Sequence, residues 1–350
     1  MDQKKVEELA FRALGDLGGT FTMALAYIGD HLGLFKLLSK EKSLSSSKLA
    51  EKAELNERYV REWLKAMVAA EYLDYDPKPD TYSMSPEQAY VLANEDSPMF
   101  VGGGFQFSVP TLYNIPRILD AFRFGGGIPY DEIGDRVPCA IERFFRPGYV
   151  NHLTQEWLPS VPGLIPKLEA GAKVADVGCG RGQSTAVMAK SYPNSEFIGI
   201  DYDKNSIAAA MKLCSDQGLK NVTFLQAAAD QLSYENAFDL ICVFDCIHDM
   251  VNPIATLACI RKALKEKGRI IWSEPNASDN PLENRNPVGK IFQSISPLHC
   301  MTVSLAHKGA GLGTVIGEKG ARSLAEEAGF KGFKKLKIDN PFNQFFLLEK

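Results

Sequence analysis

A glycine-rich turn follows an apolar segment near the middle of the chain. Residues 173–177 form a short apolar run that is typical of a buried strand, with Asp176 close to its end. Gly178, Gly180 and Gly182 come next, before a helical pattern begins. Glycines let the backbone turn sharply and allow a ligand to lie against it. The motif therefore predicts a strand, a tight turn and a helix that together bind a small molecule.

Three interpretations of this turn compete. A dinucleotide site requires Gly-x-Gly-x-x-Gly, but Gln183 occupies the position of the last glycine. The carboxylate of Asp176 would also lie poorly beside a pyrophosphate, whereas a cofactor with a cationic amino-acid part tolerates it. The third possibility is a glycine-rich turn that binds no ligand. The spacing favours the cationic cofactor.

Further acidic residues stand at the ends of the next predicted strands. Asp201 ends the second strand, where the ribose diol of a nucleoside cofactor would lie. Asp230 follows the third strand, within reach of an adenine amino group. Asp245 follows the fourth strand, and we include it in the predicted cofactor site. Each acid alone is a common feature of solvated loops, but acids at consecutive strand ends behind a glycine-rich turn rarely coincide by chance.

On these acids and glycines, residues 170–275 resemble the class I S-adenosylmethionine (SAM)-dependent methyltransferases. The resemblance implies SAM as the cofactor and a Rossmann-like, doubly wound α/β sheet that ends in an antiparallel hairpin. In that family the first-strand acid and the glycines contact the methionine part of SAM, the second-strand acid binds the ribose, and the acid after the third strand contacts adenine. The matching positions are Asp176, Gly178, Gly180, Gly182, Asp201 and Asp230.

The whole chain further resembles small-molecule O-methyltransferases, which carry a winged-helix dimerisation domain before this fold. It is more closely similar to bacterial winged-helix methyltransferases whose substrates are unassigned. In the O-methyltransferases a His-Asp pair follows the fourth strand and the histidine is the base; here the pair is His248-Asp249. Met250 departs from the pattern, because those enzymes usually carry Trp there. The resemblance implies that His248 is a general base; the alternative is a histidine that only caps or packs the strand end.

The implied reaction explains why a base would help. Methyl transfer from a sulfonium is an in-line displacement, for which positioning supplies on the order of 7–11 kcal/mol. A hydroxyl acceptor must also lose a proton, and a base with a pKa near 7 contributes about 10²–10⁴-fold. His248 lies at the C-terminal edge of a predicted strand, whereas His299 and His307 lie within 276–314, a segment with a glycine-rich stretch that we predict to be a lid. We therefore expect a small-molecule methyl acceptor that is methylated at a hydroxyl oxygen.

Three segments that differ in composition and in hydrophobic pattern position these residues. Residues 1–95 predict a helix at 48–52, a second helix capped by Asn56 and then a two-stranded ribbon, the order of an α+β winged-helix domain. Residues 96–165, rich in Gly and aromatic residues, predict either a connecting helical layer or a wall of a substrate pocket. Residues 166–350 alternate strands and helices, which predicts a parallel, doubly wound sheet. The predicted strands are 173–177, 196–201, 222–227, 238–244, 268–273, 333–338 and 343–348.

Charge and composition narrow the remaining function classes. The net charge is −4, and residues 1–95 alone carry 12 Lys and Arg against 16 Asp and Glu, also a net −4. A DNA-binding domain should be basic, so we expect the N-terminal domain to form a homodimer rather than to bind nucleic acid. A DNA-binding regulator that senses SAM or a metabolite is the alternative from another class, and a fold that binds SAM without turnover is a third. No apolar run approaches the roughly 20 residues of a membrane span, and the N-terminus lacks a signal-peptide pattern, so we expect a cytoplasmic protein.

The cysteine spacing predicts free thiols. There is no Cys-x-x-Cys pair and no regular framework, so neither disulfides nor a zinc site is expected, and we predict no metal. Most of the cysteines lie inside apolar runs, where a reduced thiol behaves as a small hydrophobic side chain. They stand at positions 139, 179, 214, 242, 246, 259 and 300.

Overall fold

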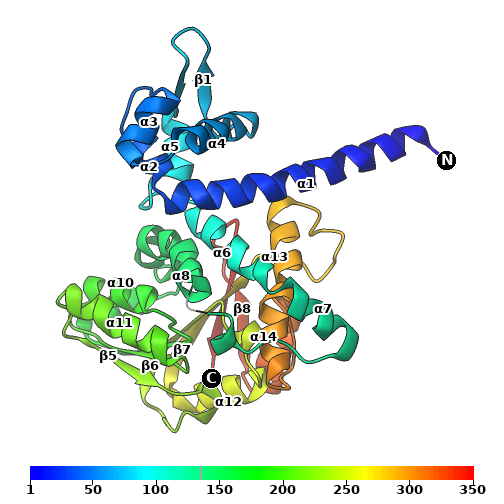
Figure 1. Cartoon of the computed structure of the whole chain (residues 1–350). Coiled ribbons are helices and arrows are strands. Elements are labelled where there is room, and N and C mark those ends of the chain that lie inside the picture. The colour runs from blue at the N-terminus through cyan, green and yellow to red at the C-terminus, as the bar shows by residue number, and fades with distance from the viewer. Residues whose placement is uncertain (135) are drawn as a thin grey trace. The chain divides into compact units, whose positions relative to one another are not determined.

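The chain folds into two compact units (Figure 1). The computed structural model describes residues 1–134 and 136–350. The segment 96–165, predicted as one connecting region, contributes residues to both units. The first unit consists of residues 1–110 and 143–147, and the second of residues 111–142 and 148–350.

The first unit is built from helices and a two-stranded antiparallel ribbon. The side chains of Ser45 and Asn56 are N-caps that accept hydrogen bonds from the backbone of Lys48 and Arg58. Trp63 and its apolar neighbours one helical turn away bury one face of α4 in the core of the unit. These elements confirm the predicted order of helices followed by a ribbon. They are α1 (Gln3–His31), α2 (Leu34–Leu38), α3 (Ser46–Ala53), α4 (Glu57–Ala69), β1 (Asp74–Asp76), β2 (Thr81–Ser83), α5 (Pro86–Leu92) and the first part of α6 (Gly102–Tyr113).

A seven-stranded sheet forms the centre of the second unit, with the strand order β5-β4-β3-β6-β7-β9-β8. The strands from β5 to β7 are parallel, whereas β9 lies antiparallel to both β7 and β8. This arrangement confirms the predicted doubly wound sheet that ends in an antiparallel hairpin. The strands are β3 (Lys173–Val177), β4 (Glu196–Asp201), β5 (Val222–Gln226), β6 (Phe238–Phe244), β7 (Leu264–Pro275), β8 (Gly332–Lys335) and β9 (Asn343–Glu349).

Two apolar cores cover the two faces of this sheet. Successive side chains of a strand point to opposite faces, so Phe345 packs with Trp157 in one core and Phe346 packs with Trp272 in the other. The helices α9 and α10 contribute to the first core, and α12 and α15 to the second. The helical elements are α7 (Ile115–Phe124), α8 (Arg136–Gly148), α9 (Leu164–Ala170), α10 (Gln183–Ser191), α11 (Lys204–Asp216), α12 (Pro253–Ala263), α13 (Pro287–Leu298), α14 (Cys300–Ala306), α15 (Gly317–Glu327), the 3₁₀ turns η1 (Tyr130–Glu132), η3 (Ala229–Gln231) and η4 (Ile247–Asp249), and the π-helix η2 (Tyr149–Trp157).

The strand order determines where a ligand can lie. The parallel strands end at the same edge of the sheet, and β3 has β4 on one side and β6 on the other. Because the chain leaves β3 towards β4 and later returns to pair β6, the order reverses there, and such a point opens a crevice beyond the strand ends. The predicted cofactor residues all follow or end these strands.

The described part of the chain contains no helix that is both long and apolar enough to cross a membrane. Its seven cysteines are free thiols, as predicted. Four of them are buried and three are partly exposed.

The carboxylate of Asp239, at the start of β6, contacts two lysine ammonium groups and one backbone N–H. Its carboxylate pairs with Lys167 at 2.7 Å and Lys265 at 2.7 Å, and accepts a hydrogen bond from the backbone of Lys173 at 2.9 Å. Burial acts to raise the pKa of Asp239, but the hydrogen bonds from Lys167, Lys173 and Lys265 outweigh it and lower the pKa to about 2. The side chain is 10% exposed, so solvent screens these contacts only weakly.

We therefore expect Asp239→Asn to lower the free energy of unfolding by about 2 kcal/mol at neutral pH. The folded-state pKa lies below the unfolded value, so the contribution is present above pH ~4 and is lost as the pH falls from about 4 to 2. Urea unfolding of both proteins at several pH values measures this difference. A difference that stays constant between pH 7 and pH 3 would contradict the assignment.

Candidate functional site

The glycine-rich turn joins β3 to α10 with three glycines of positive φ, a conformation that disfavours side chains with a Cβ. A Cβ at Gly178 would lie 2.5 Å from the Cys246 sulfur, and one at Gly182 would lie 2.7 Å from the Ala210 Cβ. Packing therefore excludes side chains at both positions. Gly180 differs, because a Cβ there would have no protein atom within 4 Å. The middle of the turn thus borders open space that a ligand could fill.

The Asp176 carboxylate lies under the first turn of α10. It is 2% exposed, and its Oδ2 accepts hydrogen bonds from the hydroxyls of Ser184 and Thr185, both at 2.6 Å. Burial raises the pKa of Asp176 to about 6, although these two hydrogen bonds lower it. In the described structure this acid anchors the start of the helix. Its predicted contact with the methionine part of a cofactor stays a prediction.

Asp201 lies beside the glycine-rich turn. Its Oδ2 accepts a hydrogen bond from the backbone N–H of Gly180 at 2.8 Å, and its Oδ1 accepts one from Asp203 at 2.9 Å. Burial raises the pKa of the carboxyl. Asp230 lies in η3, after β5, where it is partly buried. The structure therefore brings Asp201 against the turn and leaves Asp230 at the end of the neighbouring strand.

Asp245 directly follows β6 and has a left-handed backbone, with φ of 51°. Its carboxylate accepts hydrogen bonds from the Asn343 amide at 2.6 Å and the Ser273 hydroxyl at 3.1 Å. Burial, reinforced by the negative charge of Glu274, raises the pKa of Asp245 to about 7. The side chain is therefore tied to β7 and β9, and its predicted contact with a cofactor is not tested by the geometry.

His248 lies in the turn η4 and is 3% exposed. Its Nδ1 lies 2.5 Å from Oε2 of Glu274, which is fully buried, and the other Glu274 oxygen accepts a hydrogen bond from the Trp272 indole at 2.7 Å. Burial acts to lower the pKa of His248, but the Glu274 carboxylate, and after it Asp249, raise it well above its usual range. Since a carboxylate only accepts hydrogen bonds, Nδ1 carries the proton. In the neutral imidazole, Nε2 then has the free lone pair.

Glu274 was not among the predicted site residues, yet its carboxylate is the one nearest to the His248 ring: Oε2 lies 2.5 Å from Nδ1, whereas Asp249 Oδ1 lies 3.5 Å from Nε2. A signal was present, since Glu274 directly follows the predicted fifth strand at 268–273. The rule used for the acids of the first three strands would have found it.

The predicted lid segment brings further groups to this turn. It consists largely of α13 and α14, and Cys300, the first residue of α14, places its sulfur within 4.8 Å of ligand atoms of His248 and Asp249. The neighbouring His299 is buried, with its ring 6.2 Å from that of Tyr130. Tyr130 also lies 5.9 Å from Tyr202, which follows Asp201. Tyr130, a residue of the predicted aromatic segment, therefore contacts both the residue after Asp201 and the residue before Cys300.

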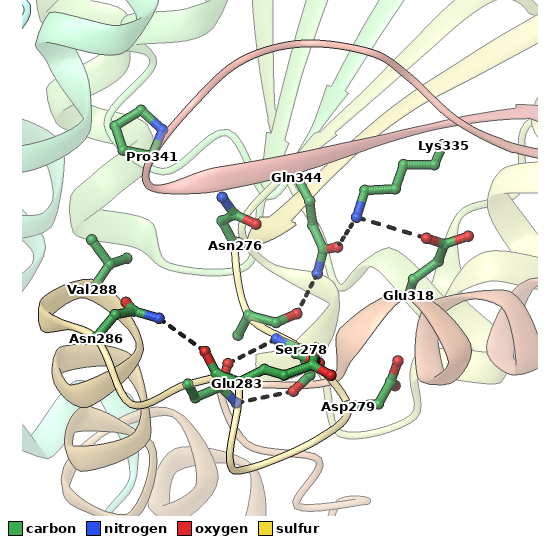
Figure 2. Close-up of a pocket in the computed structure, with 12 residues that line it drawn as sticks. Asn276, Ser278, Asp279, Glu283, Asn286, Val288, Glu318, Lys335, Pro341 and Gln344 are labelled. Carbon is green, nitrogen blue, oxygen red and sulfur yellow. Dashed lines mark hydrogen bonds and ion pairs between the residues drawn. The ribbon is translucent and has the colours of Figure 1, made fainter.

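A polar cavity of about 410 Å³ lies beside the loop that follows β7 (Figure 2). Many of the polar groups that line it hydrogen-bond to one another: Asn284 exchanges two hydrogen bonds with the backbone of Ser278, and Lys335 donates to Gln344 at 3.1 Å. None of the predicted site residues lines it. The lining residues are Asn276, Ala277, Ser278, Asp279, Glu283, Asn284, Asn286, Val288, Glu318, Lys335, Pro341 and Gln344.

Comparison with known families covers both parts of the chain. Residues 168–333 match the Methyltransferase domain family, and residues 20–94 match the Rv2258c-like winged HTH domain family. A ubiquinone biosynthesis O-methyltransferase of Methylococcus capsulatus is 30% identical over 111 residues, which are 31% of this chain and 46% of the relative. One of Acinetobacter baumannii is 25% identical over 154 residues, 43% and 59% of the two chains. The chain thus spans about half the length of the curated relatives it matches.

Two solved structures are similar over nearly the full length. The mitomycin 7-O-methyltransferase MmcR has a TM-score of 0.72 and 17% identity, and the match covers 99% of this chain and 100% of that one. Human N-acetylserotonin methyltransferase in complex with SAM has a TM-score of 0.73 and 17% identity over 97% of each chain. At these identities the likeness concerns the fold.

Proposed function

The chain joins a winged helix-turn-helix domain to a methyltransferase domain, and on this premise we propose that the protein transfers a methyl group from SAM to a small molecule, at a hydroxyl oxygen. The observation that carries the proposal is the reversal of strand order at β3: the Gly180 turn and Asp201 follow or end β3 and β4, while His248 follows β6 and pairs with Glu274 of β7. The names of two similar proteins, a ubiquinone biosynthesis O-methyltransferase and a mitomycin 7-O-methyltransferase, support oxygen as the acceptor atom.

The residues at the turn fit this cofactor. The open space at Gly180 allows a ligand to touch the backbone, and the adjacent Asp201 carboxylate can accept hydrogen bonds from a ribose diol. Acidic side chains around a positively charged cofactor are also electrostatically favourable. The residues that would hold SAM are Asp176, Gly178, Gly180, Gly182, Asp201, Asp230 and Asp245.

When bound, SAM supplies an electrophilic methyl group on a sulfonium. His248 would accept the acceptor's hydroxyl proton at Nε2, since Glu274 occupies Nδ1 and fixes the tautomer. The Trp272 indole in turn fixes the Glu274 carboxylate. A base contributes about 10²–10⁴-fold when its pKa lies near the working pH, and because Glu274 raises the pKa of His248, we expect turnover to rise as the pH increases above neutral. The alternative role for His248, packing of the strand end, would use the same contacts. Kinetic measurements on variants distinguish this role from catalysis.

The experiment that tests the proposal is methyl transfer from labelled SAM into a metabolite extract, with products identified by mass. We expect a labelled small molecule that requires both the protein and the extract, and whose label resists conditions that cleave N-methyl groups but not methyl ethers. Label that remains in SAM across all extract fractions would indicate a protein that binds the cofactor without turnover.

We also propose that the partner of the N-terminal domain is a second copy of the chain. The first two thirds of α1 extend beyond the rest of their own unit (Figure 1), and their side chains are exposed. Leu14, Leu17 and Phe21, spaced by three and four residues, share one face and are 60%, 53% and 65% exposed. An apolar stripe of this size marks an interaction surface, and two such helices could bury each other's stripes.

If α1 holds the dimer, replacing Leu14 and Leu17 together by Glu should produce a monomer. Buried carboxylates without partners are strongly unfavourable in an apolar interface. Light scattering measures the mass, and Arg12→Glu, which introduces the same charge on another side of the helix, should leave it unchanged. A wild type that is already monomeric at micromolar concentration would refute the proposal.

The DNA-binding regulator is not favoured. Each basic side chain of α4, the helix that would enter the DNA groove, is paired with an acid of the same helix: Arg61 with Glu57, and Arg58 and Lys65 with Glu62. These pairs neutralise the charge that phosphate contacts require. The predicted recognition helix therefore does not offer the unpaired basic side chains expected of a DNA-binding domain. Our proposal remains an enzyme, located in the cytoplasm.

A further inference from the structure

Three potential metal ligands of different chemical types meet beside the crevice. The imidazole of His248, the carboxylate of Asp249 and the sulfur of Cys300 each offer one atom, and these atoms lie within 4.8 Å of one another. The first two come from η4, and the third is brought by the start of α14. The sequence spacing gave no hint of this group, because its members come together only in the folded chain.

The distances suit a small tetrahedral ion. Zinc binds nitrogen and oxygen at about 2.0–2.2 Å and sulfur at about 2.3 Å, so its ligand atoms lie roughly 3.3–3.8 Å apart. His248 Nε2 and Asp249 Oδ1 are 3.5 Å apart, which is already in that range. The sulfur of Cys300 would need to move by up to about 1.5 Å, a change available to rotation of one side chain.

Two independent observations indicate that this group binds a ligand. Asp249 Oδ1 is buried and accepts no hydrogen bond from the described residues, and its ion-pair partner His248 Nε2 lies 3.5 Å away, beyond the usual hydrogen-bond length. Glu274 bonds Nδ1 of His248, as carboxylates commonly do to histidines that bind a metal through the other nitrogen. The Asp249 side chain is 31% exposed, so an ion can reach the group from solvent.

We propose that His248 Nε2, Asp249 Oδ1 and the Cys300 thiolate bind a divalent ion of the zinc class, with a fourth position open to water. Binding releases the Cys300 proton to solvent, together with any proton on Nε2, because each ligand must offer a lone pair. The ion takes the same Nε2 lone pair that a base needs. Inhibition of methyl transfer by zinc is therefore expected and rests on the proposed function, whereas the metal site itself does not.

The test uses the full-length protein without SAM, titrated with Co²⁺ as a spectroscopic probe and then with Zn²⁺. We expect one equivalent of Co²⁺ to give the intense visible bands of a tetrahedral site and a thiolate-to-metal charge-transfer band, and Zn²⁺ to abolish both. Cys300→Ser should remove the charge-transfer band, and Asp249→Asn should weaken Zn²⁺ binding by at least about 10-fold. Cys139→Ser, which changes a thiol outside the group, should alter neither.

Circular dichroism of each variant separates loss of the site from loss of the fold. The paired readout of Cys300→Ser and Asp249→Asn keeps the test decisive even if one of them unfolds. A wild-type protein that binds neither ion at stoichiometric concentration, or one whose bands persist in folded Cys300→Ser, would overturn the proposal. Either result would leave the proposals of SAM binding and methyl transfer unchanged.

Discussion

His248→Ala should reduce turnover on the true acceptor by about 10²–10⁴-fold while SAM affinity stays nearly unchanged. The imidazole is held by Glu274 at Nδ1, and His248 and Asp201 belong to strand ends on opposite sides of β3. Its loss removes the group that takes the hydroxyl proton but none of the groups that would hold the cofactor. Steady-state kinetics, together with calorimetry of SAM binding, measure the two quantities.

The deficit should also shrink as the pH approaches the acceptor's own pKa, because the proton then leaves unaided. Glu274→Gln is the companion variant: its single amide oxygen can accept from Nδ1 or from the Trp272 indole but not from both, and the charge that stabilises the imidazolium is lost, so we expect a smaller loss than in His248→Ala. Full turnover in His248→Ala at neutral pH would make the histidine structural. Loss of SAM binding and stability together would assign it to holding the strand end.

Asp201→Ala should weaken SAM binding by about 10–100-fold. A hydrogen bond to a charged group contributes roughly 1.5–3 kcal/mol, which corresponds to this range of dissociation constants. The change also removes the carboxylate that accepts the Gly180 N–H, so part of the effect arises from a looser turn. Asp216→Ala is the control, because that acid pairs with Lys212 on the surface of α11. Equal SAM affinity in wild type and Asp201→Ala would exclude the ribose role.

The central strands could be predicted closely from the sequence, since buried parallel strands are short apolar runs bounded by turns. The predicted 173–177, 196–201 and 238–244 coincide with β3, β4 and β6. The start of β7 was predicted four residues late, because Leu264–Lys267 carries charges yet pairs with β6 through Leu264. Local pattern alone does not reveal pairing of this kind.

The candidate site, like the strands, could be predicted from the sequence only in part. Acids at strand ends were visible in the sequence, and the structure places Asp201 against the glycine-rich turn. The use of the Asp176 carboxylate by Ser184 and Thr185 was not visible, because it depends on the orientation of a buried side chain. Cys300 was also missed: it lies in the predicted lid, and only the packing of α14 brings it to His248.

Calorimetric titration of the full-length protein with SAM, with NAD as the competing nucleoside cofactor, tests whether SAM is the cofactor. We expect saturable SAM binding with one site per chain, weakened by Asp201→Ala and unaffected by Asp216→Ala, and no comparable binding of NAD. A protein that does not bind SAM, or that binds NAD more tightly than SAM, would contradict it.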